Sequence, residues 1–244
     1  MNPYDQHAFE IRCEWGVQGV ATLAPISDVV IIVDVLSFST CVEVAVSRGA
    51  VVYPYSWKDE RAERYAESIG ALLADPKRTP GTFSLSPASL QTIPAGTQLV
   101  LPSPNGATLS LGTGTTPTLA GCLRNAKAVA DAAQQMGRTI AVIPAGERWR
   151  TDGSLRPSFE DWVGVGAIMR HLTRSKSPEA QSAEAVFRAT ESQSVKLLAE
   201  CSSGRELIEG GFVEDVAVAS AYNVSTGVPH LRDGCYTAIN PPLP

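Results

Sequence analysis

The 244-residue chain lacks the features that mark several common classes of protein. Its 20 lysine and arginine residues are outnumbered by 25 aspartate and glutamate residues, and no basic run exists that would contact nucleic acid. No stretch approaches the ~20 apolar residues that cross a membrane, and residues 1–16 are charged where a signal peptide would be apolar. We therefore expect a cytoplasmic protein that binds neither nucleic acid nor membrane.

Motifs of several enzyme classes are also absent. The sequence contains no GxxxxGK[ST] phosphate loop, no GxSxG nucleophile elbow and no complete GxGxxG dinucleotide fingerprint. Its five cysteines are odd in number and include no Cys-x-x-Cys pair, which argues against a disulfide framework and against a cysteine zinc site. The histidines share no spacing typical of zinc ligands or of a catalytic base, and we interpret each as structural: His7, His171 and His230.

The residues that are present favour a globular fold. Apolar residues make up 44% of the chain and charged residues 18%, which is enough to bury a sizeable core. We predict strands over residues 29–35, 51–55, 98–101 and 139–143, and helices over residues 40–48, 58–69, 126–135 and 159–173. The segments 81–97 and 112–121 are rich in Gly, Pro, Ser and Thr, and we predict that they are packed loops.

This alternation of strands and helices is typical of an α/β protein. We expect a mixed, largely parallel sheet with helices on both faces, which is a three-layer α/β/α arrangement. The C-terminal part is predicted to be helix-rich, because Ser177-Pro178 is a helix start signal and helical spacing continues to about residue 223. A last strand near residues 235–239 would close the sheet. We predict a single domain over residues 1–244, with two tightly packed subdomains as the alternative.

The first candidate site follows the strand predicted over residues 29–35. That strand ends on a carboxylate, Asp34, and Ser39 and Thr40 follow at the start of the next helix. Backbone N–H groups and the helix dipole attract anions where strand ends meet helix starts. We predict that Ser39 and Thr40 bind a phosphate group, with Asp34 beside it as metal ligand or nucleophile. In the competing interpretation Thr40 and Glu43 form a capping box.

Two amide side chains also follow predicted strands. Asn105 and Gly106 form a tight turn in which glycine lets the backbone approach a ligand, although the turn also has a purely conformational interpretation. Asn125 precedes the helix predicted over residues 126–135, where a helix cap is the simpler role and substrate binding the functional one.

A third loop concentrates charge. Glu147 follows an apolar strand, Arg156 lies farther along the loop, and Glu160 and Asp161 open a strongly apolar helix. Carboxylates that hold Mg²⁺ and a guanidinium that grips phosphate oxygens are the parts of a metal–phosphate site. The alternative is a set of exposed salt bridges, and Ser158 with Asp161 also fits a capping box.

Near the C-terminus, Arg205 lies at the start of a predicted helix and is a candidate for holding an anionic substrate. Ser203 and Glu206 beside it fit another capping box. The sequence does not choose between these two roles for the segment.

An ordered set of motifs, each weak by itself, runs from about residue 10 to residue 235. Its members are Asp34-Val-Leu-Ser-Phe-Ser-Thr40, Pro104-Asn-Gly106, Asn125-Ala126, Ala145-Gly-Glu147, Phe159-Glu-Asp161 followed by Gly164-Val-Gly-Ala-Ile168, and Ser203-Gly-Arg-Glu-Leu207. In this order they resemble the 2-phosphosulfolactate phosphatase family. The resemblance implies a distinctive α/β fold and a Mg²⁺-dependent phosphatase that releases phosphate from 2-phosphosulfolactate in coenzyme M biosynthesis.

The resemblance adds weight to a set of site residues. By resemblance, the metal-binding or catalytic candidates are Asp34, Asn105, Glu147, Glu160 and Asp161. Together with the loop chemistry, our assignment is catalysis by Asp34, Glu147 and Arg156, substrate binding by Ser39, Thr40, Asn105, Gly106, Asn125 and Arg205, and metal binding by Asp34, Glu160 and Asp161.

The chain departs from the family pattern at Ser37. The family usually has Asp-Val-Leu-Arg-Ala-Ser/Thr-Thr, whereas Ser37 and Phe38 stand here, and its Gly-Asn-Ser-Pro loop is replaced by Ser84-Leu-Ser-Pro87. A substrate with phosphate, carboxylate and sulfonate groups needs several cationic partners, so the loss of one arginine would weaken or redirect recognition.

Our leading hypothesis is a homodimeric, Mg²⁺-dependent phosphatase that acts on a small phosphorylated organic acid, with 2-phosphosulfolactate as the expected substrate. The nucleophile is either Asp34 or a water molecule positioned by the metal. The alternative is a catalytically reduced protein that binds or senses a small phosphorylated or sulfonated acid. That alternative predicts ligand binding without Mg²⁺-dependent turnover.

Overall fold

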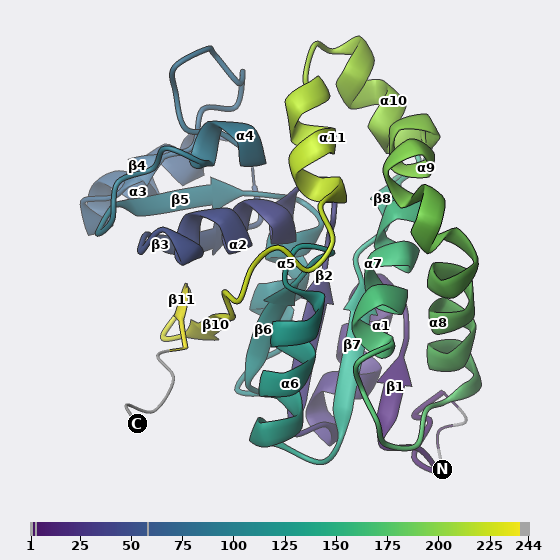
Figure 1. The fold of residues 1–244 in the computed structure, drawn as a ribbon. Coiled ribbons are helices and arrows are strands. Elements are labelled where there is room, and N and C mark those ends of the chain that lie inside the picture. The colour runs from purple at the N-terminus through teal and green to yellow at the C-terminus, as the bar shows by residue number, and fades with distance from the viewer. Residues whose placement is uncertain (1, 3, 58, 240–244) are drawn as a thin grey trace.

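A nine-stranded sheet runs through the computed structural model, which describes residues 2, 4–57 and 59–239 (Figure 1). The strands lie in the order β1 (Ile11–Cys13), β7 (Ile140–Pro144), β2 (Val29–Val33), β6 (Thr118–Gly121), β10 (Pro229–Arg232), β11 (Cys235–Ala238), β3 (Val51–Tyr55), β5 (Gln98–Pro102) and β4 (Leu72–Leu73). Strands β1, β7, β2 and β6 form one parallel block, and β3, β5 and β4 form another. The predicted mixed, largely parallel sheet is confirmed.

An antiparallel hairpin, β10–β11, joins the two parallel blocks. Strand β10 pairs with β6, and β11 pairs with β3, in each case antiparallel. The pairings β6–β10, β10–β11 and β11–β3 are all antiparallel. Because their number is odd, the strand direction of β3 and β5 is opposite to that of β2. Because the sheet twists, β5 lies at a steep angle to β2 and its carboxyl end points towards the end of β2 (Figure 1). Loops from both blocks therefore meet in one region.

Helices cover both faces of the sheet. In the described residues they are α1 (Gly16–Leu23), α2 (Phe38–Ser47), α3 (Glu60–Ile69), α4 (Pro87–Leu90), α5 (Gly106–Gly112), α6 (Ala126–Met136), α7 (Phe159–Met169), α8 (Pro178–Thr190), α9 (Ser194–Glu200), α10 (Ser202–Glu209) and α11 (Val213–Ser220). Short 3₁₀ turns follow α1 (Ala24–Ile26) and α8 (Glu191–Gln193), and a separate ribbon consists of β8 (Glu147–Arg148) and β9 (Leu155–Arg156).

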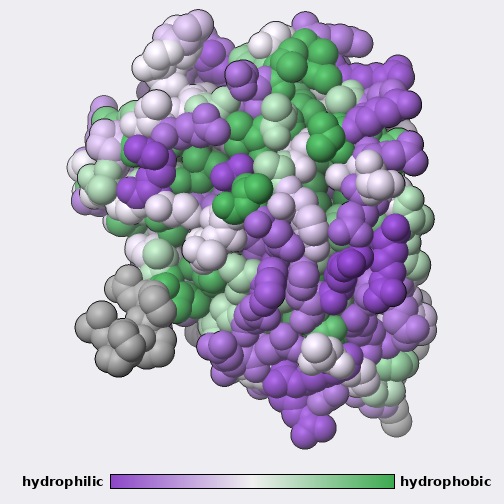
Figure 2. Space-filling model, viewed as in Figure 1, coloured by the Kyte–Doolittle hydropathy of each residue, from purple (hydrophilic) through white to green (hydrophobic). Residues whose placement is uncertain are grey.

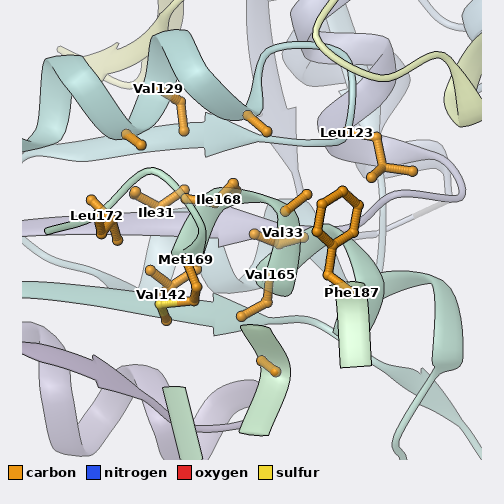
Figure 3. Close-up of a cluster of buried hydrophobic side chains, with 14 of the residues drawn as sticks. Ile31, Val33, Leu123, Val129, Val142, Val165, Ile168, Met169, Leu172 and Phe187 are labelled. Carbon is orange, nitrogen blue, oxygen red and sulfur yellow. The ribbon is translucent and has the colours of Figure 1, made fainter. Parts of the chain in front are cut away.

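Strand β2 shows why the layers form. All five of its residues are Val or Ile, and all are buried. Val29, Ile31 and Val33 belong to the core beneath α6 and α7 (Figure 3), whereas Val30 and Ile32 pack with residues of α1 and α5 on the opposite face. Successive strand residues face opposite sides of the sheet. Because every residue of β2 is apolar, helices can pack against both faces. The predicted three-layer arrangement is confirmed.

The C-terminal part is helix-rich, as predicted, from α8 to α11. The Ser177 hydroxyl accepts a hydrogen bond from the Ala180 amide, and Pro178 is the first helical residue, so the predicted start signal is confirmed. No described helix has the length and apolar character required to cross a membrane. The surface over α8 is mainly hydrophilic, and hydrophobic residues gather near α10 and α11 (Figure 2).

Several predicted boundaries are wrong. The helix predicted over residues 159–173 ends at Met169, and the two predicted packed loops contain α4 and β6. The Asn-Gly turn is the start of α5, while β1, α1 and β10 were not predicted because each is short or lacks a sequence signal. Residue 58, the predicted start of another helix, lies outside the described residues, and α3 begins at Glu60.

Gly166 lies on α7 where α8 packs against it. A Cβ atom there would clash with the carbonyl oxygen of Ala183 and lie 2.6 Å from the Cβ of Phe187. We expect Gly166→Ala to lower the free energy of unfolding by about 2 kcal/mol, because the two helices would be forced apart. Urea denaturation measures the change.

The control for this measurement is Gly112→Ala in α5, where the nearest atom to an added Cβ is 3.5 Å away. Its free energy of unfolding should change by less than about 0.5 kcal/mol. Equal losses in the two variants would contradict the role of close α7–α8 packing.

Candidate active site

Asp34 lies between β2 and α2 and is 6% exposed. Its Oδ1 accepts a hydrogen bond from the Phe38 amide at 3.1 Å, and its Oδ2 accepts one from the Gly106 amide at 2.9 Å. These amides belong to the first residues of α2 and α5. The carboxylate therefore ties together two helix starts that come from different blocks of the sheet.

Only glycine fits at position 106, because there is no room for a Cβ atom. A Cβ atom at Gly106 would lie 2.7 Å from Asp34 Oδ2 and would clash with the ring of Phe38. The side chain of Asn105, one residue earlier, donates from Nδ2 to Glu147 Oε2 at 3.0 Å. The two residues thus connect the Asp34 turn to the Glu147 loop.

Ser39 and Thr40 are both fully buried, and their hydroxyl groups bond to the backbone. The Ser39 Oγ accepts from the Asp34 amide and donates to the Ile32 carbonyl, and the Thr40 Oγ1 donates to the Val35 carbonyl at 2.7 Å. These hydroxyls bond to the backbone inside the turn, which does not favour their predicted role in substrate binding.

The capping box predicted at the same helix is wrong. Helix α2 begins at Phe38, which places Thr40 inside the first turn. Glu43, the other predicted partner, accepts instead from Arg124 Nε at 2.6 Å.

Glu147 lies on β8, directly opposite Arg156 on β9. The pKa of Glu147 is raised to about 7. Burial is the largest cause, and the negative charges of Asp34 and Glu160 act in the same direction, whereas the Asn105 hydrogen bond and the Arg156 charge act against it. A carboxyl group with a pKa near neutrality can donate or accept a proton under physiological conditions. Glu147 therefore has the properties of an acid–base group.

Arg156 is held next to Glu147 by two contacts. Its Nη2 donates to Ser203 Oγ at 3.3 Å, and its guanidinium lies 5.9 Å from the centre of the Trp149 ring. Ser203 is therefore an acceptor for Arg156, and the predicted capping box of Ser203 is wrong because Cys201 Sγ caps α10. Arg156 lines a cavity of about 510 Å³ that also contains Glu147.

Asp161 is 3% exposed and bonds to two loops at once. Its Oδ1 accepts from the Val35 amide at 2.7 Å, and its Oδ2 accepts from the Gly146 amide at 2.8 Å. The Ser158 hydroxyl donates to Oδ2, which replaces the predicted capping box. Burial raises the pKa of Asp161, and the nearby charges of Asp34 and Glu160 act in the same direction.

The carboxylates predicted to bind metal do not form one ligand cluster. No group of three or more His, Cys, Asp or Glu side chains in the described part of the chain is arranged to hold a metal ion. Asp161 is occupied by backbone amides, and Glu160, which is 2% exposed, accepts a hydrogen bond from Cys201 Sγ at 3.4 Å. Of the predicted metal ligands, only Asp34 lines the central cleft described below.

Two predicted substrate-binding residues lie outside the site. Asn125 is fully buried, its Oδ1 accepts from the Cys122 amide, and its Nδ2 donates to the Ala120 and Gly227 carbonyls. Its side chain does not cap α6. Arg205 is exposed on α10 and does not line the central cleft. Substrate binding by Asn125 is not favoured by this burial, and for Arg205 it stays a prediction.

The central cleft has a volume of about 540 Å³ and brings together residues from both blocks of the sheet. Its polar lining includes Asp34, Asn105 and Glu147, which were predicted, and Ser37 and Arg78, which were not assigned to the site. Arg78 pairs with Asp215, a residue 137 positions away, so no local sequence pattern could have placed it here. Ser37 could have been recognised from the sequence, because it follows Asp34 by three residues in the same loop.

Comparison with known proteins gives one consistent result. The sequence profile of the family described as 2-phosphosulpholactate phosphatase matches residues 19–234. A probable 2-phosphosulfolactate phosphatase of Carboxydothermus hydrogenoformans is 32% identical over 216 residues, which cover 84% of this chain and 87% of that protein. The 2-phosphosulfolactate phosphatase of Methanothermobacter thermautotrophicus is 29% identical over 213 residues, covering 85% of this chain and 88% of that protein.

The raised pKa of Glu147 predicts a pH dependence of stability. The folded protein holds the Glu147 proton up to about pH 7, whereas a glutamate in the unfolded chain loses it near 4.5, so stability falls as pH rises between these values. Glu147→Gln removes this loss. We expect the variant to gain on the order of 2 kcal/mol relative to wild type between pH 5 and pH 8.

Urea denaturation at the two pH values, without added metal, measures this difference. The control is Glu179→Gln at the first turn of α8, which is exposed and should follow the wild type at both values. A constant difference between Glu147→Gln and wild type across the pH range would contradict the raised pKa.

Proposed function

The chain belongs to the 2-phosphosulfolactate phosphatase family, and we propose that it hydrolyses the phosphate monoester of a small organic acid, with 2-phosphosulfolactate as its substrate. The observation that carries the proposal is the pairing of two different carboxyl groups in one cleft. Asp34 is fixed between two helix starts, and Glu147 holds its proton up to about pH 7.

The phosphate group would lie at the Asp34 end of the cleft. The start of α2 supplies the positive end of a helix dipole there, which favours an anion. A phosphate dianion beside Asp34 nevertheless suffers repulsion from the carboxylate, and this repulsion requires a cation.

Mg²⁺ fits this requirement. It prefers oxygen ligands and is commonly bound through one or two protein carboxylates together with phosphate oxygens and water. Asp34 is the cleft-lining carboxylate that would hold it. When bound, Mg²⁺ would neutralise charge that develops on the phosphoryl oxygens.

The chain's own residues would then carry the proton and the attack. Glu147 in its protonated form donates to the bridging ester oxygen as that oxygen leaves, because the alkoxide formed otherwise is a poor leaving group. Attack on phosphorus comes from Asp34, with the resulting acyl phosphate then hydrolysed by water, or directly from a water molecule that Asp34 orients. In both routes the water supplies the new oxygen of the released phosphate, its proton passes to solvent or to that phosphate, and the Asp34 carboxylate is needed. Arg156 faces Glu147 and stabilises the ionised form that Glu147 takes after it has donated its proton.

Replacement of Asp34 tests the centre of the proposal. We expect Asp34→Asn to lower kcat by at least about 10³-fold with Mg²⁺ present, because it removes the metal ligand and either route of attack. Phosphate release from 2-phosphosulfolactate, phospholactate and p-nitrophenyl phosphate, with and without Mg²⁺, is the measurement. Asp131→Asn, exposed on α6, is the matched control. Ligand binding without turnover in the wild type would instead support a sensor.

The pH dependence of turnover tests Glu147. Since the donating form is protonated, kcat should fall as pH rises through about 7 and approach a tenfold loss per unit above it. Glu147→Gln should lower kcat and remove this fall. The titration of the phosphate group near pH 6 affects wild type and variant alike, so their ratio isolates Glu147. A ratio that does not change with pH would contradict the assignment.

A further inference from the structure

Ser37 has an unsatisfied hydroxyl in the central cleft. The residue is 4% exposed, directly precedes α2 and lines the cleft beside Asp34. Its Oγ is the one buried side-chain oxygen or nitrogen in the described part of the chain that has no hydrogen-bond partner. Buried polar atoms are almost always paired, so an unpaired one that lines a cleft points to a ligand atom as its partner.

Arg78 is the cationic side chain among the described residues that line the same cleft, and it shares its charge with Asp215. Among the described residues that line the cleft, the charged side chains are Asp34, Glu147, Glu206 and Arg78. Three of these are carboxylates, and Glu206 is paired outward with Arg150 at 2.6 Å. A ligand with more than one acidic group can therefore find a cationic side chain in this cleft only at Arg78.

The guanidinium of Arg78 is held in place with donors to spare. Its Nη1 donates to Asp215 Oδ2 at 3.1 Å, and it lies 4.7 Å from the centre of the Phe212 ring. Asp215 is fixed in turn by the Ser86 hydroxyl and by the Ala88 amide at 3.0 Å. A guanidinium has five N–H donors, and the others on Arg78 donate to no described residue. Its position is set by the protein while most of its hydrogen-bonding capacity is unused.

We propose that Ser37 and Arg78 form a subsite for the second acidic group of the substrate, a carboxylate or a sulfonate. The inference rests on the proposed function, in which the phosphate group lies at Asp34. The second oxyanion accepts hydrogen bonds from the Arg78 guanidinium and the Ser37 hydroxyl.

Binding of the two reaction products separates this subsite from the phosphate position. The probes are 3-sulfolactate, which carries the second acidic groups, and inorganic phosphate, which carries none, each titrated by calorimetry into the Mg²⁺-loaded protein. We expect Ser37→Ala to weaken 3-sulfolactate binding about 5-fold, and Arg78→Gln about 50-fold, with phosphate binding unchanged within twofold. Arg78→Lys should fall between wild type and Arg78→Gln.

Matched controls are Ser68→Ala on α3 and Arg170→Gln at the end of α7, both away from the cleft. Ser37→Ala removes a hydroxyl without a partner, so its Tm should stay within about 2 °C of wild type, and this variant tests the subsite even where Arg78→Gln is unstable. A structural role for the Ser37 hydroxyl would instead lower Tm without a selective loss of 3-sulfolactate binding.

If Arg78→Gln weakens the binding of 3-sulfolactate and of phosphate equally, Arg78 contacts the phosphate group and the inference is overturned. Unchanged binding of both probes in the variants would also overturn it. Comparison of kcat/KM for 2-phosphosulfolactate and phospholactate identifies the acidic group. If the sulfonate occupies the subsite, Ser37→Ala should lower kcat/KM for the first about 5-fold and leave the second unchanged; equal losses would assign the carboxylate. Product binding does not require turnover, so failure of the proposed phosphatase activity is distinguishable from failure of the subsite.

Discussion

The buried carboxylate of Asp161 is the interaction on which the geometry of the site depends. It accepts the amides of Val35 and Gly146, and these residues are the immediate neighbours of Asp34 and Glu147. A single side chain at the start of α7 thus sets how far apart the two functional carboxyl groups lie. Asn105 and Gly106 make the same connection from the other block of the sheet, through bonds to Glu147 and Asp34. The loops that follow β2, β5 and β7 are therefore fixed by hydrogen bonds to carboxylates.

This arrangement concentrates negative charge where little water can screen it. Burial raises the pKa values of both Glu147 and Asp161, and the charge of Asp34 raises each of them further. The backbone amides lower the energy of the ionised carboxylates but carry no full charge. A bound cation at Asp34, as proposed, would offset this charge, and so does one carboxyl group that stays protonated. Those two features match the parts of a metal-assisted phosphatase, in which an acid must protonate the leaving oxygen.

The sequence predicted the sheet and the carboxylates but not how polar groups are partnered. The unbroken Val and Ile run of β2 led directly to Asp34, because a doubly buried strand has a strong pattern. Ser39 and Thr40 looked like phosphate ligands, yet their hydroxyls satisfy the backbone of the turn, and the same residue types suit both roles. Asp161 resembled a helix cap because its long-range partners are invisible in local sequence. Arg78 was missed for the same reason, since its partner Asp215 is 137 residues away.

The β10–β11 hairpin explains why a cleft exists at all between segments so far apart in the chain. In a flat, wholly parallel sheet, the carboxyl ends of β2 and β5 would lie along one edge but with four strands between them. The hairpin instead reverses the second block, and the twist of the sheet brings the end of β5 towards the end of β2 (Figure 1). Tyr236 of β11 fixes this corner, because its buried hydroxyl donates to Ser110 of α5 at 2.7 Å. The Gly106 amide at the start of α5 donates to Asp34, so the β10–β11 hairpin helps to position the Asp34 carboxylate through α5.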